Sequence, residues 1–517
     1  MTNAAHVVAQ RRFEKLFIGG EWITRSSSAV LTVTSPATGK AVGSVPCGDG
    51  VDVDRAVMAA RRSFEAGVWA STPPAQRADV LTRTAELLDQ RAEEIIGLIS
   101  DEMGAPAISV RMMQYLPATA TLRSYASAAV EYPWREYRAG TFGTVQVTRE
   151  PVGVVGAITA WNVPLFLMMN KLGAALAAGC SVVLKPAPQT PLSANWVAEL
   201  FAEAGLPAGA LSVVPGGAAT GEALVKHREV DKISFTGSTK VGKAIGVECA
   251  RRLARCSLEL GGKSAAIVLA DADIPAIAAM LAFSGLMNTG QACVAQTRIL
   301  VPRSRRDELV EALVQAAQAM KVGLPDDPAA MLGPLISHEQ RARVEGFVEK
   351  GKAAGATAVL DGGRPDGLGE GFFVLPTIFT NVTNDMEIAR EEIFGPVLSI
   401  IDYDTEEEAV ALANDSDYGL AGSVWTQDVE RGLEIAAKIR TGTFGVNLYA
   451  NDPCAPFGGY KQSGIGRENG PEGLESYLEH KSVMLPLGYS AMNWPPSRGP
   501  RARWSGCSRQ GCCCDGR

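Results

Sequence analysis

The chain has 517 residues, 46% of them hydrophobic and 20% charged, a composition typical of a soluble globular protein too long for one core. Its 49 lysines and arginines stand against 56 acidic residues, and the formal net charge of -7 provides no basic surface for nucleic acid. The sequence has neither a run of 18 apolar residues nor the apolar core of a signal peptide, so we expect no membrane span and a cytoplasmic protein.

The amino-terminal part of the chain is predicted to be scaffold. Strands with turns are expected at 16–23 and 33–45. From Asp52 the pattern becomes helical, and Leu81, Leu88 and Ile95 recur at seven-residue spacing, as on the packed face of one helix. Between 131 and 155 apolar and polar residues alternate as in a strand, which we expect to project and to pair with another subunit.

Residues 152–210 alternate between strand and helix, which predicts a parallel sheet covered by helices. Such sheets bind ligands at the carboxyl ends of their strands, where the loops AWNVP (160–164) and KPAPQTP (185–191) follow here. Asn162 taken alone is better explained as a turn residue before a proline. Lys185 is harder to explain structurally, because the interior of a sheet does not accommodate a free ammonium group.

A further strand-to-helix turn is expected in ISFTGSTKVGKA (233–244), where glycines let backbone N–H groups approach a phosphate. Gly237, Gly242 and Lys243 resemble a Walker A loop, but Ala244 stands where a Ser or Thr must hold magnesium. A nucleoside triphosphatase is therefore not expected. The dinucleotide fingerprint GxGxxG follows none of the predicted strands, so that motif alone assigns no Rossmann fold.

Two residues farther along are candidates for chemistry. Glu259, in LELGGK (258–263), is either a solvent-facing strand carboxylate or a general base in an apolar cleft. Cys293, in NTGQACVAQTR (288–298), is either a small buried side chain or a nucleophile. The four histidines are all isolated in the sequence, which argues against a metal centre and against a Cys-His couple.

The remainder again mixes helices and strands. Amphipathic helices are predicted at 305–321 and 338–355, and a glycine-rich loop, APFGGYKQSGIGRE, at 455–468. A last strand at 477–485 is expected to pair with the strand in the 140s. After Gly488 the tail lacks apolar periodicity and is predicted to be disordered, with metal capture by its four cysteines as the alternative. The six other cysteines are scattered and are expected to stay reduced.

In order, the motifs AWNVP, FTGSTKVG, LELGGK, GQACVAQTR, EEIFGPV and PFGGYKQSG resemble the NAD(P)-dependent aldehyde dehydrogenases from about Leu16 to Leu487. The resemblance implies an α/β architecture of three parts. These are a Rossmann-like cofactor-binding domain (1–130 and 151–260), an α/β catalytic domain (261–460) and a small β-hairpin oligomerisation element (131–150 with 477–487), followed by the tail 488–517. It also implies a homodimer or homotetramer.

The resemblance implies that Cys293 attacks the aldehyde, giving an oxyanion held by the amide of Asn162 and the backbone N–H of Cys293. Hydride leaves for the nicotinamide, and Glu259 activates the water that hydrolyses the remaining thioester. Lys171 is the fourth catalytic residue expected. The cofactor is expected to contact Lys185, Trp161, Gly237, Ser238, Gly242, Leu260, Glu392 and Phe394.

Two departures from the family pattern bear on specificity. Pro188 replaces a glutamate that repels a 2'-phosphate in NAD-using members, which weakens the case for strict NAD preference. NAD is still expected, with NADP possible, because Glu392 is present and no arginine stands beside Pro188 to hold a 2'-phosphate. The aldehyde tunnel is expected to be roomier and partly polar, lined by Val163, Phe166, Asn170, Met287 and Phe457. The alternatives are a coenzyme A-acylating enzyme, which Glu259 disfavours, and a catalytically silent structural or binding protein, which would not need both Cys293 and Glu259.

Overall fold

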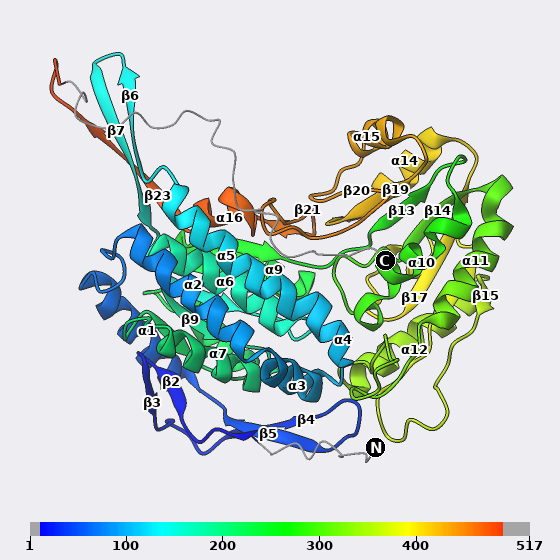
Figure 1. Ribbon diagram of the computed structural model, residues 1–517, viewed down its shortest axis with the longest axis horizontal. Helices are drawn as coiled ribbons and strands as arrows, with labels where there is room; N and C mark the ends of the chain where they lie inside the picture. Colours follow the sequence, from blue (N-terminus) through cyan, green and yellow to red (C-terminus); the bar gives the residue numbers. More distant parts are fainter. Residues whose placement is uncertain (1–10, 490–517) are drawn as a thin grey trace, which may run out of the picture.

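The computed structural model describes residues 11–489 and has two lobes, each built on a mainly parallel sheet, with a narrow third sheet projecting from one of them (Figure 1). The parallel α/β organisation expected from the alternating pattern is confirmed. The disorder predicted for the tail, and the metal capture considered for its cysteines, concern residues that from 490 onward lie outside the described part of the chain.

The first sheet has eight strands, and its central strands run parallel. All five residues of the central strand β8 are buried, because helices cover both faces of the sheet. The strands, in spatial order, are β22 (Gly464–Ile465), β12 (Arg255–Glu259), β11 (Lys232–Thr236), β8 (Val154–Ile158), β9 (Ser181–Lys185), β10 (Leu211–Val213), β2 (Leu16–Ile18) and β3 (Glu21–Ile23).

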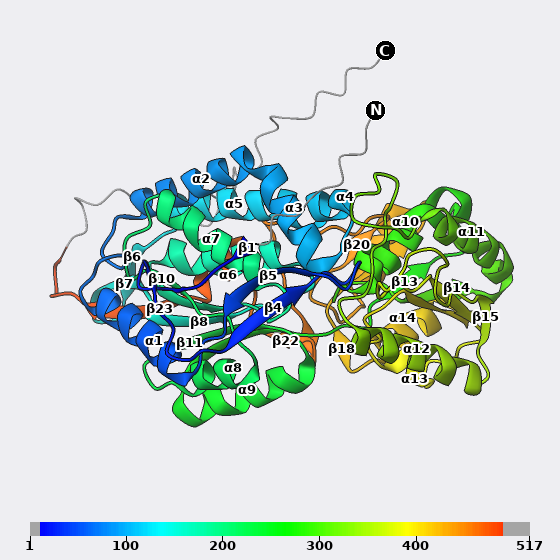
Figure 2. The same cartoon turned by 90° about the horizontal axis from the view of Figure 1, so that it is seen from below.

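Helices form one layer on each side of this sheet, as Figure 2 shows. One layer contains α2 (Pro74–Gln90), α3 (Ala92–Met103), α5 (Leu116–Glu131), α6 (Pro164–Ala178) and α7 (Pro191–Glu203). The other contains α1 (Gly50–Glu65), α8 (Ala218–Lys226) and α9 (Thr239–Arg252). Helix α6 is buried almost all round, which its run of alanines and leucines allows.

The second sheet, in the other lobe, has seven strands. They are β15 (Thr357–Leu360), β16 (Thr377–Thr380), β17 (Val397–Tyr403), β14 (Arg298–Pro302), β13 (Ala265–Val268), β19 (Gly422–Trp425) and β20 (Gly445–Val446). Along β14, Ile299 and Val301 pack towards α10 (Ile274–Leu286) and α11 (Arg306–Ala319), whereas Leu300 packs on the opposite face. That face carries α12 (His338–Ala353), α13 (Glu387–Arg390), α14 (Glu406–Asn414) and α15 (Val429–Ala436).

The third sheet consists of β6 (Arg135–Gly140), β7 (Gly143–Pro151) and β23 (Leu478–Met484), and it extends away from the body (Figure 1). The expected pairing of the last strand with the strand in the 140s is confirmed, since Leu478 to Met484 pair antiparallel with Pro151 to Val145. The strand predicted at 131–155 is instead the antiparallel hairpin of β6 and β7, followed by β8.

The single helix predicted through Leu81, Leu88 and Ile95 is wrong, because α2 ends at Gln90 and α3 begins at Ala92. All three apolar side chains are nevertheless buried. The smaller elements are β1 (Arg11–Arg12), β4 (Val30–Thr34), β5 (Ala41–Pro46), α4 (Ala107–Val110), the π-helix η1 (Arg111–Tyr115), the 3₁₀-helices η2 (Met287–Gly290) and η3 (Arg303–Arg305), β18 (Tyr418–Gly419), β21 (Tyr460–Lys461) and α16 (Gly470–Glu475). Across residues 11–489 no helix has the length and apolar character needed to cross a membrane.

Candidate active site

The strand order of the first sheet reverses between β8 and β11. From β8 the chain goes to β9 on one side, and later strands add on the other, beginning with β11. Open α/β sheets bind their ligands at the carboxyl ends of the strands that flank such a reversal. Here β8 leads into the loop with Asn162, β11 into Gly237 and Ser238, and the neighbouring β12 ends at Glu259.

Cys293 lies in the loop between η2 and β14. A run of three residues shortly before it, 288–290, has a left-handed backbone conformation. The φ angles of Asn288, Thr289 and Gly290 are 52°, 58° and 73°. A Cβ at Gly290 would lie 2.1 Å from the carbonyl oxygen of Gly395, so glycine is required there by space as well as by conformation. Such backbones are strained for other residues and persist only where surrounding contacts hold them.

Buried hydrogen bonds supply those contacts. The Asn288 side-chain amide donates to the carbonyls of Asn162 (2.8 Å) and Gln291 (3.1 Å). Gln291 Nε2 donates to the Pro334 carbonyl, and Gln291 Oε1 accepts from the backbone N–H of Ile336 at 3.0 Å. The loop that carries Cys293 is therefore fastened on both sides by side chains that sequence reasoning did not single out.

Asn162 is buried and directed at this loop. Its Nδ2 donates to the carbonyl of Gln291 at 3.0 Å, which orients the amide towards the cysteine loop and leaves a second N–H. On the other side, a Cβ added to Gly262 would lie 2.4 Å from the carbonyl oxygen of Cys293. The segment that follows Glu259 thus packs directly against the backbone of Cys293.

The Cys293 thiol is half-buried. Burial raises its pKa to about 12, and the nearby charges of Glu392 and Glu259 add to the effect. The side chain is therefore a neutral thiol at physiological pH in this state. A nucleophilic role requires that a base remove its proton.

Glu259 is the general base expected from the sequence, and its charge acts on the Cys293 thiol together with that of Glu392. Its side chain is 4% exposed, and neither carboxylate oxygen has a hydrogen-bond partner among the described residues. Burial raises its pKa well above the usual value, the charge of Glu468 raises it further, and Lys171 acts in the opposite direction. A carboxylate in this state can take up a proton near neutral pH.

Lys171 and Glu468 form a buried ion pair next to Glu259. The ammonium also donates to Ser234 at 3.3 Å, and Asn170 donates to the second oxygen of Glu468 at 3.4 Å. Sequence reasoning placed Lys171 in the site but missed Glu468. The available signal was an acidic residue at the end of a glycine-rich loop, which by itself indicates only a surface turn.

The expected cofactor residues fall into two groups, one at the strand ends and one beside the cysteine loop. Lys185 ends β9, where its Nζ donates to the Pro186 carbonyl and burial lowers its pKa to about 8. Glu392 Oε1 accepts from the backbone N–H of Gly262 at 2.9 Å, and burial raises its pKa to about 7. The Phe394 ring lies edge-to-face on Trp161, with centroids 5.4 Å apart.

The remaining cofactor candidates surround the start of α9. Ser238 is the N-cap, and its hydroxyl accepts from the N–H of Val241. Gly242 packs on Leu260, because a Cβ there would lie 2.3 Å from that side chain. At the strand ends beside them, the buried hydroxyls of Thr159 and Thr236 have no protein partner within residues 11–489. Unsatisfied polar atoms at a strand reversal fit a crevice that receives a polar ligand.

The expected tunnel residues are placed unevenly. Met287 and Phe457 are buried, and Met287 clusters with Ala292 and Ala295. Partly buried Met113 and Val294 pack on that cluster, so apolar side chains line the wall beside Cys293. Asn170 is buried with its amide turned to Glu468, so it contributes less polarity to a tunnel than expected.

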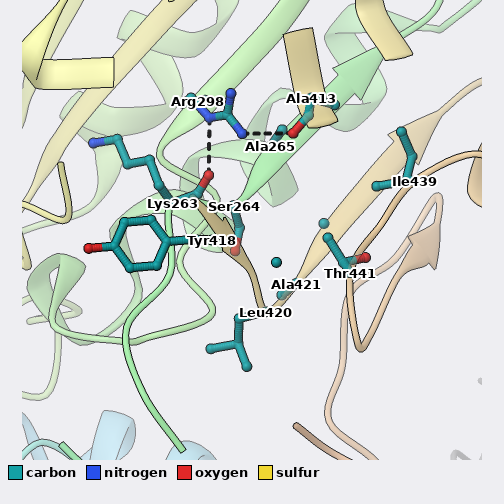
Figure 3. Close-up of a pocket in the computed structure, with 12 residues that line it drawn as sticks. Lys263, Ser264, Ala265, Arg298, Ala413, Tyr418, Leu420, Ala421, Ile439 and Thr441 are labelled. Atoms are coloured by element: carbon teal, nitrogen blue, oxygen red, sulfur yellow. Dashed lines mark hydrogen bonds between the residues drawn. The ribbon is translucent and has the colours of Figure 1, made fainter. Parts of the chain in front are cut away.

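A pocket behind the LELGGK segment is lined by Lys263, Arg298 and Tyr418 (Figure 3). Arg298 is fully buried and donates to the carbonyls of Lys263 and Ala413. These bonds tie the start of β14 to the segment after Glu259 and to the end of α14. Arg298 was quoted in the cysteine motif, but sequence reasoning assigned it no role.

No group of three or more potential metal ligands occurs in the described part of the chain.

The family model of the aldehyde dehydrogenase family matches residues 22–483. Geranial dehydrogenase of Castellaniella defragrans is 46% identical over 473 residues, covering 91% of this chain and 98% of its own.

Solved structures of related proteins share this fold. An aldehyde dehydrogenase of Mycobacterium tuberculosis complexed with NAD+ has a TM-score of 0.92 and 55% identity, covering 93% of this chain and 100% of its own. A mutant of aldehyde dehydrogenase C from Pseudomonas syringae, complexed with NAD+ and octanal, has a TM-score of 0.88 and 42% identity, covering 92% and 96%. The chain therefore belongs to the aldehyde dehydrogenase family.

Proposed function

We propose that this protein oxidises an aldehyde to the carboxylic acid with NAD+ as the hydride acceptor. The observation that carries the proposal is the meeting of Cys293, the Asn162 amide and the Glu259 carboxylate where the two lobes join. The NAD+ complexes of the Mycobacterium tuberculosis and Pseudomonas syringae relatives support the choice of cofactor.

Cys293 is the proposed nucleophile. Once deprotonated, its sulfur attacks the aldehyde carbon, and the carbonyl oxygen becomes an oxyanion. The second N–H of the Asn162 amide and the backbone N–H of Cys293 hold that oxyanion. NAD+, when bound, supplies the acceptor for the hydride that leaves this intermediate, so that a thioester remains on Cys293.

The residues proposed to hold the cofactor are those of the strand reversal. Gly237, Ser238 and Gly242, at the start of α9, would hold the pyrophosphate, and Leu260 packs against Gly242 there. Lys185 and Glu392 would hold the two riboses. Trp161 and Phe394, which lie edge-to-face, would contact the nicotinamide side.

Glu259 is the proposed base of the second half-reaction. Its raised pKa lets it accept the proton of the water that hydrolyses the thioester. The ion pair of Lys171 and Glu468 sets the charge around Glu259, and we assign Lys171 this electrostatic role. The presence of Glu259 favours hydrolysis over transfer of the acyl group to coenzyme A.

The proposed substrates are apolar aldehydes of medium length. The wall beside Cys293 contains Met113, Met287 and Val294, flexible or small apolar side chains that can fit a hydrocarbon. Two relatives agree with this class, one named a geranial dehydrogenase and one complexed with octanal. Val163, Phe166 and Phe457 complete the proposed lining.

We propose that the projecting sheet of β6, β7 and β23 joins subunits into a dimer or tetramer, because both its outer strands offer edges for pairing. The domain boundaries expected from the sequence stay a prediction. Residues 461–476, which lie outside both expected domains, contribute β22 to the first sheet.

The function is tested by assaying octanal, geranial, a short aldehyde and a charged aldehyde with NAD+, with NADP+, and with NAD+ plus coenzyme A. We expect acid formation from the apolar aldehydes with NAD+, without a requirement for coenzyme A. Reduction of cofactor only in the presence of coenzyme A, or with no aldehyde at all, would contradict the proposal.

A further inference from the structure

Helix α9 and strand β12 lie against each other in opposite directions, and their contacts follow a regular order. The buried positions of α9 are Gly242, Ile245 and Cys249, spaced as one helical face. A Cβ at Gly242 would lie 2.3 Å from the Leu260 side chain, and one at Gly246 would lie 3.6 Å from Leu258.

The next contact in this order joins Cys249 to Cys256. Cys256 is on the same face of the strand as Leu258, because alternate residues of a strand share a face. The loop between helix and strand is short, and Ala254 N–H donates to the Cys249 carbonyl at 3.0 Å, which folds the chain back directly. Cys249 lies in the apolar cluster that contains Leu258 and Leu260, and Cys256 packs against the same cluster, which brings the two thiols together.

The surroundings activate one of these thiols and shield the other. Cys249 is buried, whereas Cys256 is half-buried. Strand β22 pairs with β12 only at Leu258 and Glu259, so it leaves the strand edge at Cys256 open within residues 11–489. The side-chain interaction with Cys249 and the charge of Lys232 lower the pKa of Cys256 to about 6, while the interaction with Cys256 and burial raise the pKa of Cys249.

We propose that Cys249 and Cys256 form a redox-active dithiol, a site of reversible oxidation by peroxides that is separate from Cys293. The Cys256 thiolate attacks one oxygen of hydrogen peroxide, which yields a sulfenic acid on Cys256 and hydroxide. The Cys249 sulfur then attacks the Cys256 sulfur, releasing water and forming an intramolecular disulfide. In total two thiols and one peroxide give one disulfide and two waters, and an added dithiol reductant reverses the reaction.

The sequence makes this disulfide easy to identify. Trypsin cuts after Lys243, Arg251, Arg255 and Lys263, so Cys249 and Cys256 fall on the separate peptides AIGVECAR and CSLELGGK. The full-length protein is treated with hydrogen peroxide at pH 7, blocked with iodoacetamide and digested without reductant. We expect these two peptides as one disulfide-linked species that disappears when a dithiol reductant is added before blocking.

Three variants complete the test. Cys249→Ser and Cys256→Ser are each expected to abolish the linked species, whereas Cys180→Ser, at a fully buried cysteine, keeps it. The proposal is overturned if Cys256 is recovered as a sulfinic acid without the link. It is also overturned if Cys256 is found joined to a cysteine other than Cys249, or if Cys256 stays a free thiol while Cys293 is oxidised.

Discussion

The ammonium group of Lys171 lies 2.5 Å from a carboxylate oxygen of Glu468, and both side chains are buried beside Glu259. The two ion-pair partners are nearly 300 residues apart in the chain and come together where α6 meets the segment before α16. The pair places one compensated negative charge next to the proposed base. Its loss should therefore affect both folding and the charge state of Glu259.

Lys171→Met is expected to lower the free energy of unfolding by about 3–5 kcal/mol, because it leaves the Glu468 charge buried without a partner. The matched double variant, Lys171→Met with Glu468→Gln, removes both charges and should recover most of this loss. Chemical denaturation of the three proteins measures the effect. A double variant as unstable as the single one would show that the two charges do not compensate each other.

The stability of the protein should depend on pH through Glu259. Its pKa is raised by folding, so the folded state holds the proton more tightly than the unfolded chain does. Its contribution to stability is thus fully present below the unfolded value, about 4.3, and is lost as pH rises through the folded pKa. The Glu259→Gln variant does not lose this contribution, so the difference in free energy of unfolding, variant minus wild type, should rise as pH rises from 5 to 8. A difference that does not change with pH would contradict the raised pKa.

Gly290→Ala should displace the loop that carries Cys293, since the added methyl group would meet the Gly395 carbonyl at 2.1 Å in a left-handed conformation. We expect a loss of stability of more than 1 kcal/mol and a kcat at least tenfold lower. The control is Gly346→Ala in α12, where a Cβ meets nothing within 4 Å. This exposed helical position should gain about 0.5–1 kcal/mol and keep full activity. Equal effects of the two changes would remove the role assigned to the loop geometry.

NAD+ should be preferred to NADP+, because Glu392 is retained and no arginine stands beside Pro188 to hold a 2'-phosphate. Pro188→Glu should lower kcat/KM for NADP+ more than for NAD+, whereas Pro188→Gln, which lacks the charge, should not. Steady-state kinetics with both cofactors decide this. A tenfold advantage of NADP+ in the wild type, about 1.4 kcal/mol of transition-state binding, would reverse the assignment.

The sequence predicted the parts of this protein that depend on local pattern. Alternation and helical periodicity located the parallel sheet and the pairing of β7 with β23, and the predicted strand ends indicated the loops that contain Asn162 and Lys185. The break between α2 and α3 was missed, because apolar spacing continues across it. Periodicity reports which face is buried and not whether the backbone continues.

The parts of the site that the sequence did not predict depend on contacts between residues far apart in the chain. Glu468 pairs with Lys171 only because β22 and α16 return to the first lobe. The hydrogen bonds of Asn288 and Gln291 follow from three successive left-handed residues, two of which are not glycine. No local preference predicts that conformation, since it is held by partners from other parts of the fold.

We propose that Cys293 carries the acyl group and that Glu259 mainly activates the water that removes it. Rapid-mixing absorbance of reduced cofactor tests this most directly, with wild type, Cys293→Ala and Glu259→Gln. We expect no cofactor reduction by Cys293→Ala. Glu259→Gln should give a fast burst of one equivalent per active site, followed by turnover about 10²–10⁴-fold slower than wild type. A slowed burst would mean that Glu259 also deprotonates the thiol. An undiminished steady-state rate in Glu259→Gln would contradict the account.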